Sequence, residues 1–374
     1  MPSWLKEGRG SLCGANVSLL LREMGITKPL LVAGERTKNV FFARTGMRLP
    51  VFDAFHPNPD LQDCVAGAAL YQEKGCDGLI SIGGGSAMDT AKGIKALLMT
   101  DIAHVRANQL PSEGNVPHLA IPGTAGTGAE TTAVAVLYEN GQKLSVDYPA
   151  LLPDGVLLDG SLLDTLPEYH RKSCAMDALA QGIESWWAKK ATPGSRIHAE
   201  RAIRGVLDNL TAYLQGDRKA QDEMLHAAYE SGVAILTTRT TAAHAMSYQI
   251  TKKLGAAHGH ACMLTLPHLW AHLAAQAEYQ PMLTELSRLL GGEKPMDGAI
   301  LLKGLLAVLE LDKIPMPDDA TLDMLAASVN PERLGNHPEA LTTAQLRAIY
   351  VQAFTPMTDT ERAEAIAAWE QYGK

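Results

Sequence analysis

The chain contains 374 residues, of which 46% are hydrophobic and 20% are charged. A chain of this length exceeds one ordinary core, so we expect two domains, and its composition excludes a disordered protein. The formal net charge of -8 is spread along the chain without a basic run, which argues against binding to nucleic acid or to an anionic membrane surface.

The cysteines are scattered and include no CxxC pair; they are Cys13, Cys64, Cys76, Cys174 and Cys262. This pattern fits reduced thiols better than a disulfide framework, and we expect these residues to act as small buried hydrophobes. Residues 1–10 lack the pattern of a signal peptide, and no apolar run approaches the roughly 18 residues of a membrane span. We therefore expect a cytoplasmic protein.

The first half of the chain alternates short apolar runs with helical patterns, which is typical of βαβ units around a parallel sheet. Strands are predicted over residues 29–33, 78–82, 118–121 and 155–158. Helices are predicted over residues 58–75 and 86–99, where apolar residues recur at spacings of three and four.

The second half of the chain loses these strand signals after about Leu162. It is rich in Ala, Leu and Glu with helical periodicity, and helices are predicted over residues 167–189, 195–214 and 219–254. The sequence therefore predicts an α/β domain over residues 1–162 and an all-helical domain over residues 163–374.

Two glycine-rich loops follow predicted strands. Gly83-Gly84-Gly85-Ser86 opens a predicted helix, where backbone amides and the positive helix end can bind a phosphate group, although glycines also make tight turns. A second loop covers residues 122–130. Neither is the GxGxxG fingerprint, and the first βα turn reads Ala33-Gly34-Glu35-Arg36-Thr37-Lys38. Two such loops on one sheet favour a dinucleotide.

Polar residues in the helical half form a candidate metal site. Asp177 and Gln181 lie four apart on one predicted helix face, which alone is most often a solvated face. Three histidines, His244, His258 and His260, follow within an otherwise apolar stretch. Imidazoles and a carboxylate that converge from separate helices suit Fe(II) or Zn(II), which polarises a carbonyl for hydride attack.

In order and spacing, these features resemble the iron-containing (group III) alcohol dehydrogenases, a family related in fold to dehydroquinate synthase. The resemblance covers nearly the whole chain. It implies a metal-dependent NAD(P)H oxidoreductase and at least a homodimer. The residues that carry the resemblance are Gly83 to Ser86, Asp89, Lys92, Pro122 to Glu130, Pro153, Asp159, Asp177, Glu184 and His244 to His258.

The resemblance places the metal ligands on Asp177, His244 and His258, with Gln181 where the family usually has a histidine. Gln181 then either coordinates or leaves its position to water. Tyr248 stands where many members carry a histidine that is often proposed to relay the proton. The catalytic candidates are therefore Tyr248, the alternative relay His260, and Lys143.

The cofactor site implied by the resemblance lies on the glycine loops. Where members that prefer NAD carry an acidic residue, this chain has Gly34, so a 2′-phosphate could pair with Arg36 and Lys38, although Glu35 opposes it. NADPH is therefore predicted over NADH. The other cofactor-binding candidates are Gly83, Gly84, Gly85, Ser86, Asp89, Thr124, Ala125, Thr127 and Lys143.

The stretch around His244 is similar to the branch with phosphonoacetaldehyde reductases, which make 2-hydroxyethylphosphonate. That likeness predicts a phosphonate substrate and makes Arg239 a candidate to bind it, with Lys252 or Lys253 as alternatives that could equally be solvated. Reduction of a generic short-chain aldehyde is the first alternative. A lyase of the dehydroquinate synthase type and a non-catalytic relative without metal are the others.

Overall fold

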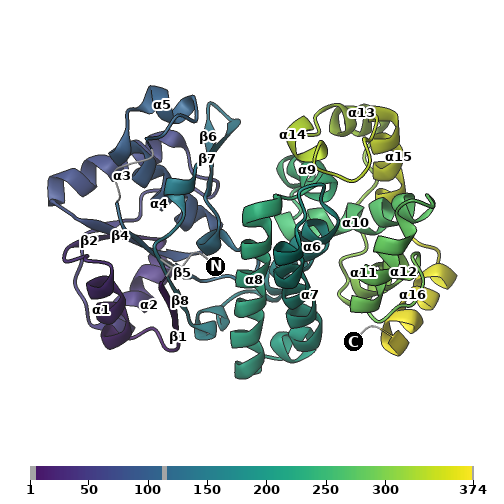
Figure 1. Cartoon of the computed structure of the whole chain (residues 1–374), viewed down its shortest axis with the longest axis horizontal. Helices are drawn as coiled ribbons and strands as arrows, with labels where there is room; N and C mark the ends of the chain where they lie inside the picture. Colours follow the sequence, from purple (N-terminus) through teal and green to yellow (C-terminus); the bar gives the residue numbers. More distant parts are fainter. Residues whose placement is uncertain (1–5, 112–115, 373–374) are drawn as a thin grey trace. The chain divides into compact units, whose positions relative to one another are not determined.

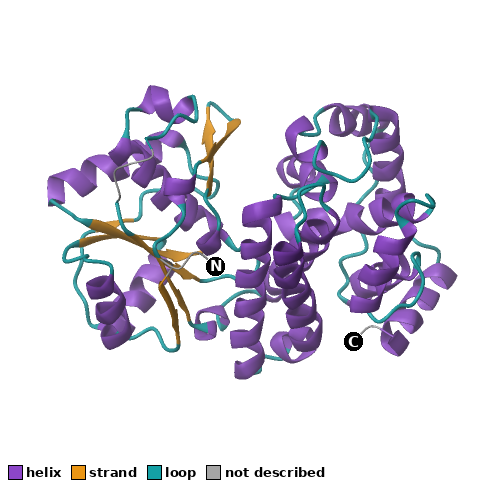
Figure 2. Ribbon diagram, in the orientation of Figure 1, coloured by secondary structure: helices purple, strands orange, loops and turns teal. Residues whose placement is uncertain are grey.

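The computed structural model describes residues 6–111 and 116–372. The chain divides into two compact units, Met1–Thr165 and Leu166–Lys374, so the observed boundary follows Thr165 where the sequence placed it after Leu162 (Figure 1). The first unit carries a parallel sheet and the second is built from helices, which confirms the predicted fold class (Figure 2).

The sheet of the first unit has six parallel strands in the order β1-β8-β5-β4-β2-β3. All four strands predicted from the sequence are present. The strands are β1 (Lys6–Arg9), β2 (Pro29–Ala33), β3 (Val51–Phe52), β4 (Gly78–Gly83), β5 (His118–Pro122) and β8 (Gly155–Leu158). The chain moves outward from β2 to β3 and then returns to place β4 on the other side of β2, so the strand order reverses between β2 and β4.

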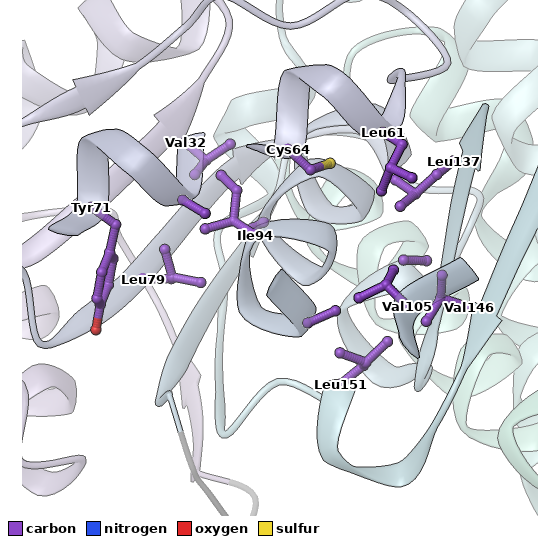
Figure 3. Close-up of a cluster of buried hydrophobic side chains, with 14 of the residues drawn as sticks. Val32, Leu61, Cys64, Tyr71, Leu79, Ile94, Val105, Leu137, Val146 and Leu151 are labelled. Carbon is purple, nitrogen blue, oxygen red and sulfur yellow. The ribbon is translucent and has the colours of Figure 1, made fainter. Parts of the chain in front are cut away.

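Helices cover both faces of this sheet. Leu31 and Ile80 pack with α1 (Gly14–Glu23) and α2 (Glu35–Thr45) on one face. Val32 and Leu79 pack on the other face with α3 (Leu61–Lys74) and α4 (Gly85–Met99) (Figure 3). Consecutive strand residues point to opposite faces, so a fully apolar strand fits a sheet covered on both sides.

The first unit also contains elements that the sequence analysis did not predict. A two-stranded antiparallel hairpin joins β6 (Val134–Glu139) to β7 (Gln142–Asp147), and α5 is a short helix over Ile102–Arg106. The 3-10 turns are η1 (Ala129–Thr131), η2 (Pro149–Leu151) and η3 (Gly160–Leu163). Leu137 and Val146 of the hairpin extend the core that contains α4 (Figure 3).

The second unit has no strand among its described residues, 166–372. Its helices are α6 (Glu168–Trp187), α7 (Pro193–Leu214), α8 (Arg218–Thr238), α9 (Ala242–Gln249), α10 (His258–Ala274), α11 (Gln280–Leu289), α12 (Asp297–Val308), α13 (Asp319–Ala327), α14 (Pro331–Leu334), α15 (Thr343–Phe354) and α16 (Asp359–Tyr372), with a π-helical turn, η4, over Ile250–Leu254. No helix in the described ranges combines the length and the apolar character needed to cross a membrane.

The helix predicted over residues 219–254 is broken after Thr238. Arg239 has a φ of 63° and a ψ of 176°, a backbone conformation that ends α8. A separate helix, α9, begins at Ala242. Buried Glu184 of α6 accepts hydrogen bonds from the backbone amides of Thr241 and Ala243, at 3.1 and 2.8 Å. A carboxylate from another helix thus satisfies the free amides at the start of α9.

Candidate functional site

A cluster of side chains that could hold a metal ion lies in the second unit, where α6, α9 and α10 meet. Asp177 Oδ1 lies 3.2 Å from His244 Nε2 and 3.9 Å from His258 Nε2. Cys262 Sγ lies 3.9 Å from His258 Nε2, and the four donor atoms are all within 4.8 Å of one another. The three residues that the resemblance placed together therefore meet, and a cysteine joins them.

Gly259 explains how α10 comes so close to α6. A Cβ at this position would lie 1.9 Å from the backbone oxygen of Ser173 and 2.7 Å from Asp177 Cβ. Only glycine allows this approach, because side chains essentially never make contacts that short. The absence of a side chain at residue 259 therefore brings His258 beside Asp177.

Neighbouring groups fix the direction of both imidazoles. His244 Nδ1 donates to the buried Glu184 carboxylate, so Nε2 is the nitrogen that faces Asp177. Ser247 Oγ donates to the carbonyl oxygen of His244 at 2.8 Å and therefore accepts from His258 Nδ1 at 3.3 Å. Both histidines thus turn Nε2 toward one point, which is the arrangement that outer partners impose on metal-binding histidines.

The charges of the cluster depend on one another. Burial alone would lower the pKa of His258, but the negative charges of Cys262 and Asp177 outweigh it and raise that pKa to about 9. Burial alone would raise the pKa of the Cys262 thiol, but the positive charges of His244 and His258 lower it to about 7. Carboxylate, thiolate and imidazole together form a donor set that a divalent transition metal fits.

Gln181 lies at the edge of this cluster and is 4% exposed. Its carboxamide nitrogen faces Asp177 Oδ1 at 3.5 Å, and its carboxamide oxygen lies 2.8 Å from Ser231 Oγ, a hydroxyl that is also 2.8 Å from the carbonyl oxygen of Ala228. The side chain thus bridges Asp177 and helix α8.

The two candidate proton relays have different surroundings. The Tyr248 ring is parallel to the imidazole of His258, with ring centroids 6.1 Å apart. His260 instead pairs Nδ1 with the Tyr169 hydroxyl at 3.1 Å and Nε2 with the Leu311 carbonyl at 2.9 Å. The structure thus places Tyr248 beside the cluster and His260 in a hydrogen-bond network that links three segments of the second unit.

The cationic candidates for substrate binding lie close to α9 in the chain. Arg239 is half-buried and its guanidinium donates to the carbonyl oxygen of Leu236 at 2.9 Å. Lys252 and Lys253 are exposed on the π-helical turn.

The two glycine loops of the first unit lie against each other at the carboxyl ends of β4 and β5. Gly123 N donates to the Gly83 carbonyl oxygen at 2.7 Å, and a Cβ on Gly84 would lie 3.2 Å from Thr124 Cγ2. Gly83 has a φ of 147°, and Gly84 caps helix α4. The loops therefore present the amide end of α4 at the sheet edge, the usual place for a phosphate group.

Buried Lys92 of α4 holds the second loop in place. Its ammonium group donates to the carbonyl oxygens of Ala129 and Val134, at 2.7 and 2.9 Å. Asp89 lies on the same helix. Burial raises the pKa of its carboxyl group to about 6, although the positive charge of Lys92 lowers it in part.

The remaining cofactor candidates surround these loops at different depths. Ser86 Oγ accepts from the amide of Asn58 at 3.2 Å, and Thr127 Oγ1 accepts from the amide of Ala129 at 3.3 Å. Ala125 is fully buried, whereas Lys143 is exposed on β7. Ala125 therefore has a packing role. Ser86 and Thr127 lie in the loop region, and Lys143 lies on the hairpin.

The first βα turn follows β2, the strand next to β4 in the sheet. Gly34 caps α2 and has open space around its Cα. Arg36 donates to the carbonyl oxygen of Thr165 at 2.8 Å. Lys38 pairs with Glu35 and, at 2.7 Å, with Asp53. Because the strand order reverses between β2 and β4, these turns flank a topological switch point, where open parallel sheets bind dinucleotides.

Models of one protein family match both halves of the chain. The iron-containing alcohol dehydrogenase model matches residues 3–160, and the model of the C-terminal region of the Fe-containing alcohol dehydrogenase family matches residues 172–354. A solved structure, sulfoacetaldehyde reductase from Bifidobacterium kashiwanohense in complex with NAD+, is similar with a TM-score of 0.85 and 26% identity, covering 95% of this chain and 97% of that one.

Two curated relatives are enzymes that act on small molecules. The chain is 30% identical to the NAD-dependent methanol dehydrogenase of Bacillus methanolicus, over 75% of this chain and 77% of the relative. It is 36% identical to the phosphonoacetaldehyde reductase of Streptomyces viridochromogenes, over 57% of this chain and 58% of that protein, so less than two thirds of the reductase is covered. The chain belongs to the iron-containing alcohol dehydrogenase family and is an oxidoreductase.

Proposed function

We propose that this protein reduces phosphonoacetaldehyde to 2-hydroxyethylphosphonate with a reduced nicotinamide cofactor and a divalent metal ion, Fe(II) or Zn(II). The observation that carries the proposal is the convergence of Asp177, His244 and His258 at the junction of α6, α9 and α10. Gln181 beside Asp177 is the fourth candidate from the sequence.

Each residue of the metal site has a separate task. Asp177 supplies negative charge, and His244 and His258 supply neutral imidazole nitrogens, oriented by Glu184 and Ser247. A divalent ion held there supplies Lewis-acid polarisation of the aldehyde oxygen. A reduced nicotinamide cofactor held by the glycine loops would supply the hydride for the carbonyl carbon, and a residue of this chain would supply the proton that completes the alcohol.

Tyr248 is the residue we assign to proton delivery, directly or through a water molecule. Its ring lies beside the metal ligand His258, and a phenol can donate a proton to a developing alkoxide. His260 is the less suitable donor, because its two ring nitrogens already pair with protein groups. Lys143 stays a candidate for the cofactor side of the reaction.

The proposed substrate carries a dianionic phosphonate group. Two similar proteins are reductases of a two-carbon aldehyde with an anionic head group, phosphonate in one and sulfonate in the other. Arg239 is the proposed partner of that group, since a guanidinium binds phosphonate oxygens in pairs. Its backbone occupies a region that costs roughly 1–3 kcal/mol for a residue other than glycine, and such strain concentrates at ligand-binding sites.

Steady-state kinetics with phosphonoacetaldehyde, acetaldehyde and butanal test the proposal. We expect kcat/KM to be highest for phosphonoacetaldehyde. Arg239→Gly, which suits the backbone but removes the charge, is expected to raise KM for phosphonoacetaldehyde alone, and Arg239→Lys is expected to retain part of the preference. Equal kcat/KM values for all three aldehydes would support generic aldehyde reduction instead, and no reduction of any aldehyde would contradict the proposal.

The preference for NADPH over NADH stays a prediction. It depends on Arg36 and Lys38, and Lys38 is held by Glu35 and Asp53, two carboxylates that oppose a 2′-phosphate. We therefore expect only a modest preference for NADPH in the wild-type protein, measured as the ratio of kcat/KM for the two cofactors.

A further inference from the structure

We propose that Cys262 is the fourth metal ligand, together with Asp177, His244 and His258, and that Gln181 positions Asp177 without binding the ion. This inference rests on the proposed metal-dependent function and specifies its site. The cysteine enters from α10, one helical turn after His258, so both side chains lie on the same face of that helix.

The spacing of the donor atoms fits a small tetrahedral site. Zinc bonds of about 2.0–2.3 Å place two donors of a tetrahedron roughly 3.3–3.6 Å apart. The corresponding separations are 3.2 Å from Asp177 Oδ1 to His244 Nε2, and 3.9 Å both from Asp177 Oδ1 to His258 Nε2 and from Cys262 Sγ to His258 Nε2. All the separations among the four donor atoms are at most 4.8 Å, so side-chain shifts of up to about 1 Å bring all four onto one ion.

The carboxamide of Gln181 is oriented away from metal binding. An ion near Asp177 would meet the Gln181 NH2 group, which has no lone pair to offer, because the carboxamide oxygen faces Ser231 on α8. The contact of the amide with Asp177 Oδ1 instead restrains the carboxylate. Gln181 thus resembles Glu184 and Ser247, which hold ligands in position.

The sulfur ligand affects which metal the site selects. A thiolate favours Zn(II) over Fe(II) when the other donors are imidazole and carboxylate, because zinc binds Cys, His and Asp together in tetrahedral sites. Zinc can also expand to five ligands, so an aldehyde oxygen can bind without displacing the cysteine. The proposal therefore predicts a zinc enzyme with a sulfur donor at its metal.

Loading the metal-free full-length protein with Co(II) tests the sulfur ligand without reference to activity. We expect a sulfur-to-cobalt charge-transfer band in the near ultraviolet, and X-ray absorption of the Zn(II) form is expected to show a sulfur neighbour at about 2.3 Å. Cys262→Ser is expected to abolish the band and weaken Zn(II) binding roughly tenfold or more, since even partners of a ligand change metal affinity by about 10–100-fold.

Two variants complete the test. Cys76→Ser, a cysteine of the first unit, is the matched control and is expected to retain the band. Gln181→Ala is expected to keep the sulfur signals with a smaller loss of affinity than Cys262→Ser. Wild-type protein that binds Co(II) without the band overturns the proposal and leaves the proposed function standing, whereas protein that binds neither Co(II) nor Zn(II) overturns both.

Discussion

Glu184 determines the orientation of His244 in the proposed metal site. Its carboxylate accepts from His244 Nδ1 and also from the amides of Thr241 and Ala243 at the start of α9. Glu184→Gln keeps the size of the side chain but removes the charge that favours donation from Nδ1. We expect Zn(II) affinity to fall by about 10–100-fold, measured by competition with a chelating dye.

Glu230→Gln is the matched control for this change. Glu230 is a buried carboxylate of the same unit that also pairs with a histidine, His198, but it lies outside the metal cluster. An equal loss of affinity in both variants would show that the effect is general destabilisation, which would contradict the role assigned to Glu184.

Asp53 is the residue that tests the cofactor preference. Its carboxylate lies 2.7 Å from Lys38 Nζ, so it neutralises the cation expected to meet a 2′-phosphate. Asp53→Asn removes one of the two opposing charges, and we expect the ratio of kcat/KM for NADPH over NADH to rise by up to about 5-fold, since a partly exposed ion pair contributes at most roughly 1 kcal/mol. An unchanged ratio would indicate that the 2′-phosphate of bound NADPH does not contact Lys38.

At the residue scale, the sequence predicted part of the proposed metal site. Asp177, His244 and His258 followed from family resemblance, and the structure brings them together. Cys262 was expected to be a buried hydrophobe, and the available signal was its spacing of four from His258 on one helix. Composition cannot distinguish a cysteine that packs in the core from one that binds a metal. The difference depends on which helices, and which of their side chains, surround the cysteine in the folded protein.

The contact between helices α6 and α10 is the element-level feature on which the site depends. Gly259→Ala places a methyl group against the backbone of Ser173 and Asp177, and overpacking of this kind typically costs about 1–3 kcal/mol. We expect α10 to move away from α6, with loss of Zn(II) binding measured by metal analysis and a lower melting temperature.

Gly194→Ala serves as the control for Gly259→Ala. Gly194 lies in the first turn of α7, and a Cβ there would contact only Thr192 Oγ1, at 3.8 Å. This variant is expected to keep its metal and its stability. Full metal content in Gly259→Ala would show that the close approach of the two helices is not required.

Two elements show why the sequence described the fold only in part. The helical pattern of residues 219–254 contains no proline, and its one glycine, Gly232, lies seven residues before Arg239, so the break at Arg239 depends on a backbone conformation that tertiary contacts impose. The β6–β7 hairpin turns at Asn140-Gly141, where both residues have positive φ, and an Asn-Gly pair between two short apolar segments is a hairpin signal that the sequence does carry. The buried parallel strands were predictable because both of their faces are apolar.

At the scale of the whole molecule, the metal and the cofactor are assigned to different units. Hydrogen exchange followed by mass spectrometry can separate their effects, because each ligand protects the segments that it stabilises. We expect Zn(II) to slow exchange in α6, α9 and the start of α10, and NADPH to slow exchange in the loops after β4 and β5. Protection of the glycine loops by Zn(II) alone would contradict this division.

The proposed homodimer is a second whole-molecule property. It rests on family resemblance, and light scattering coupled to size-exclusion chromatography measures it against the 40.1 kDa mass of one chain.

The most direct test of the central claim measures metal content and aldehyde reduction on the same sample. Purified protein is assayed with phosphonoacetaldehyde and NADPH before chelation, after chelation, and after Zn(II) or Fe(II) is returned. We expect roughly one ion per chain at the start, loss of activity with loss of metal, recovery when metal is restored, and no recovery in Asp177→Asn. Undiminished activity in metal-free protein would contradict the account.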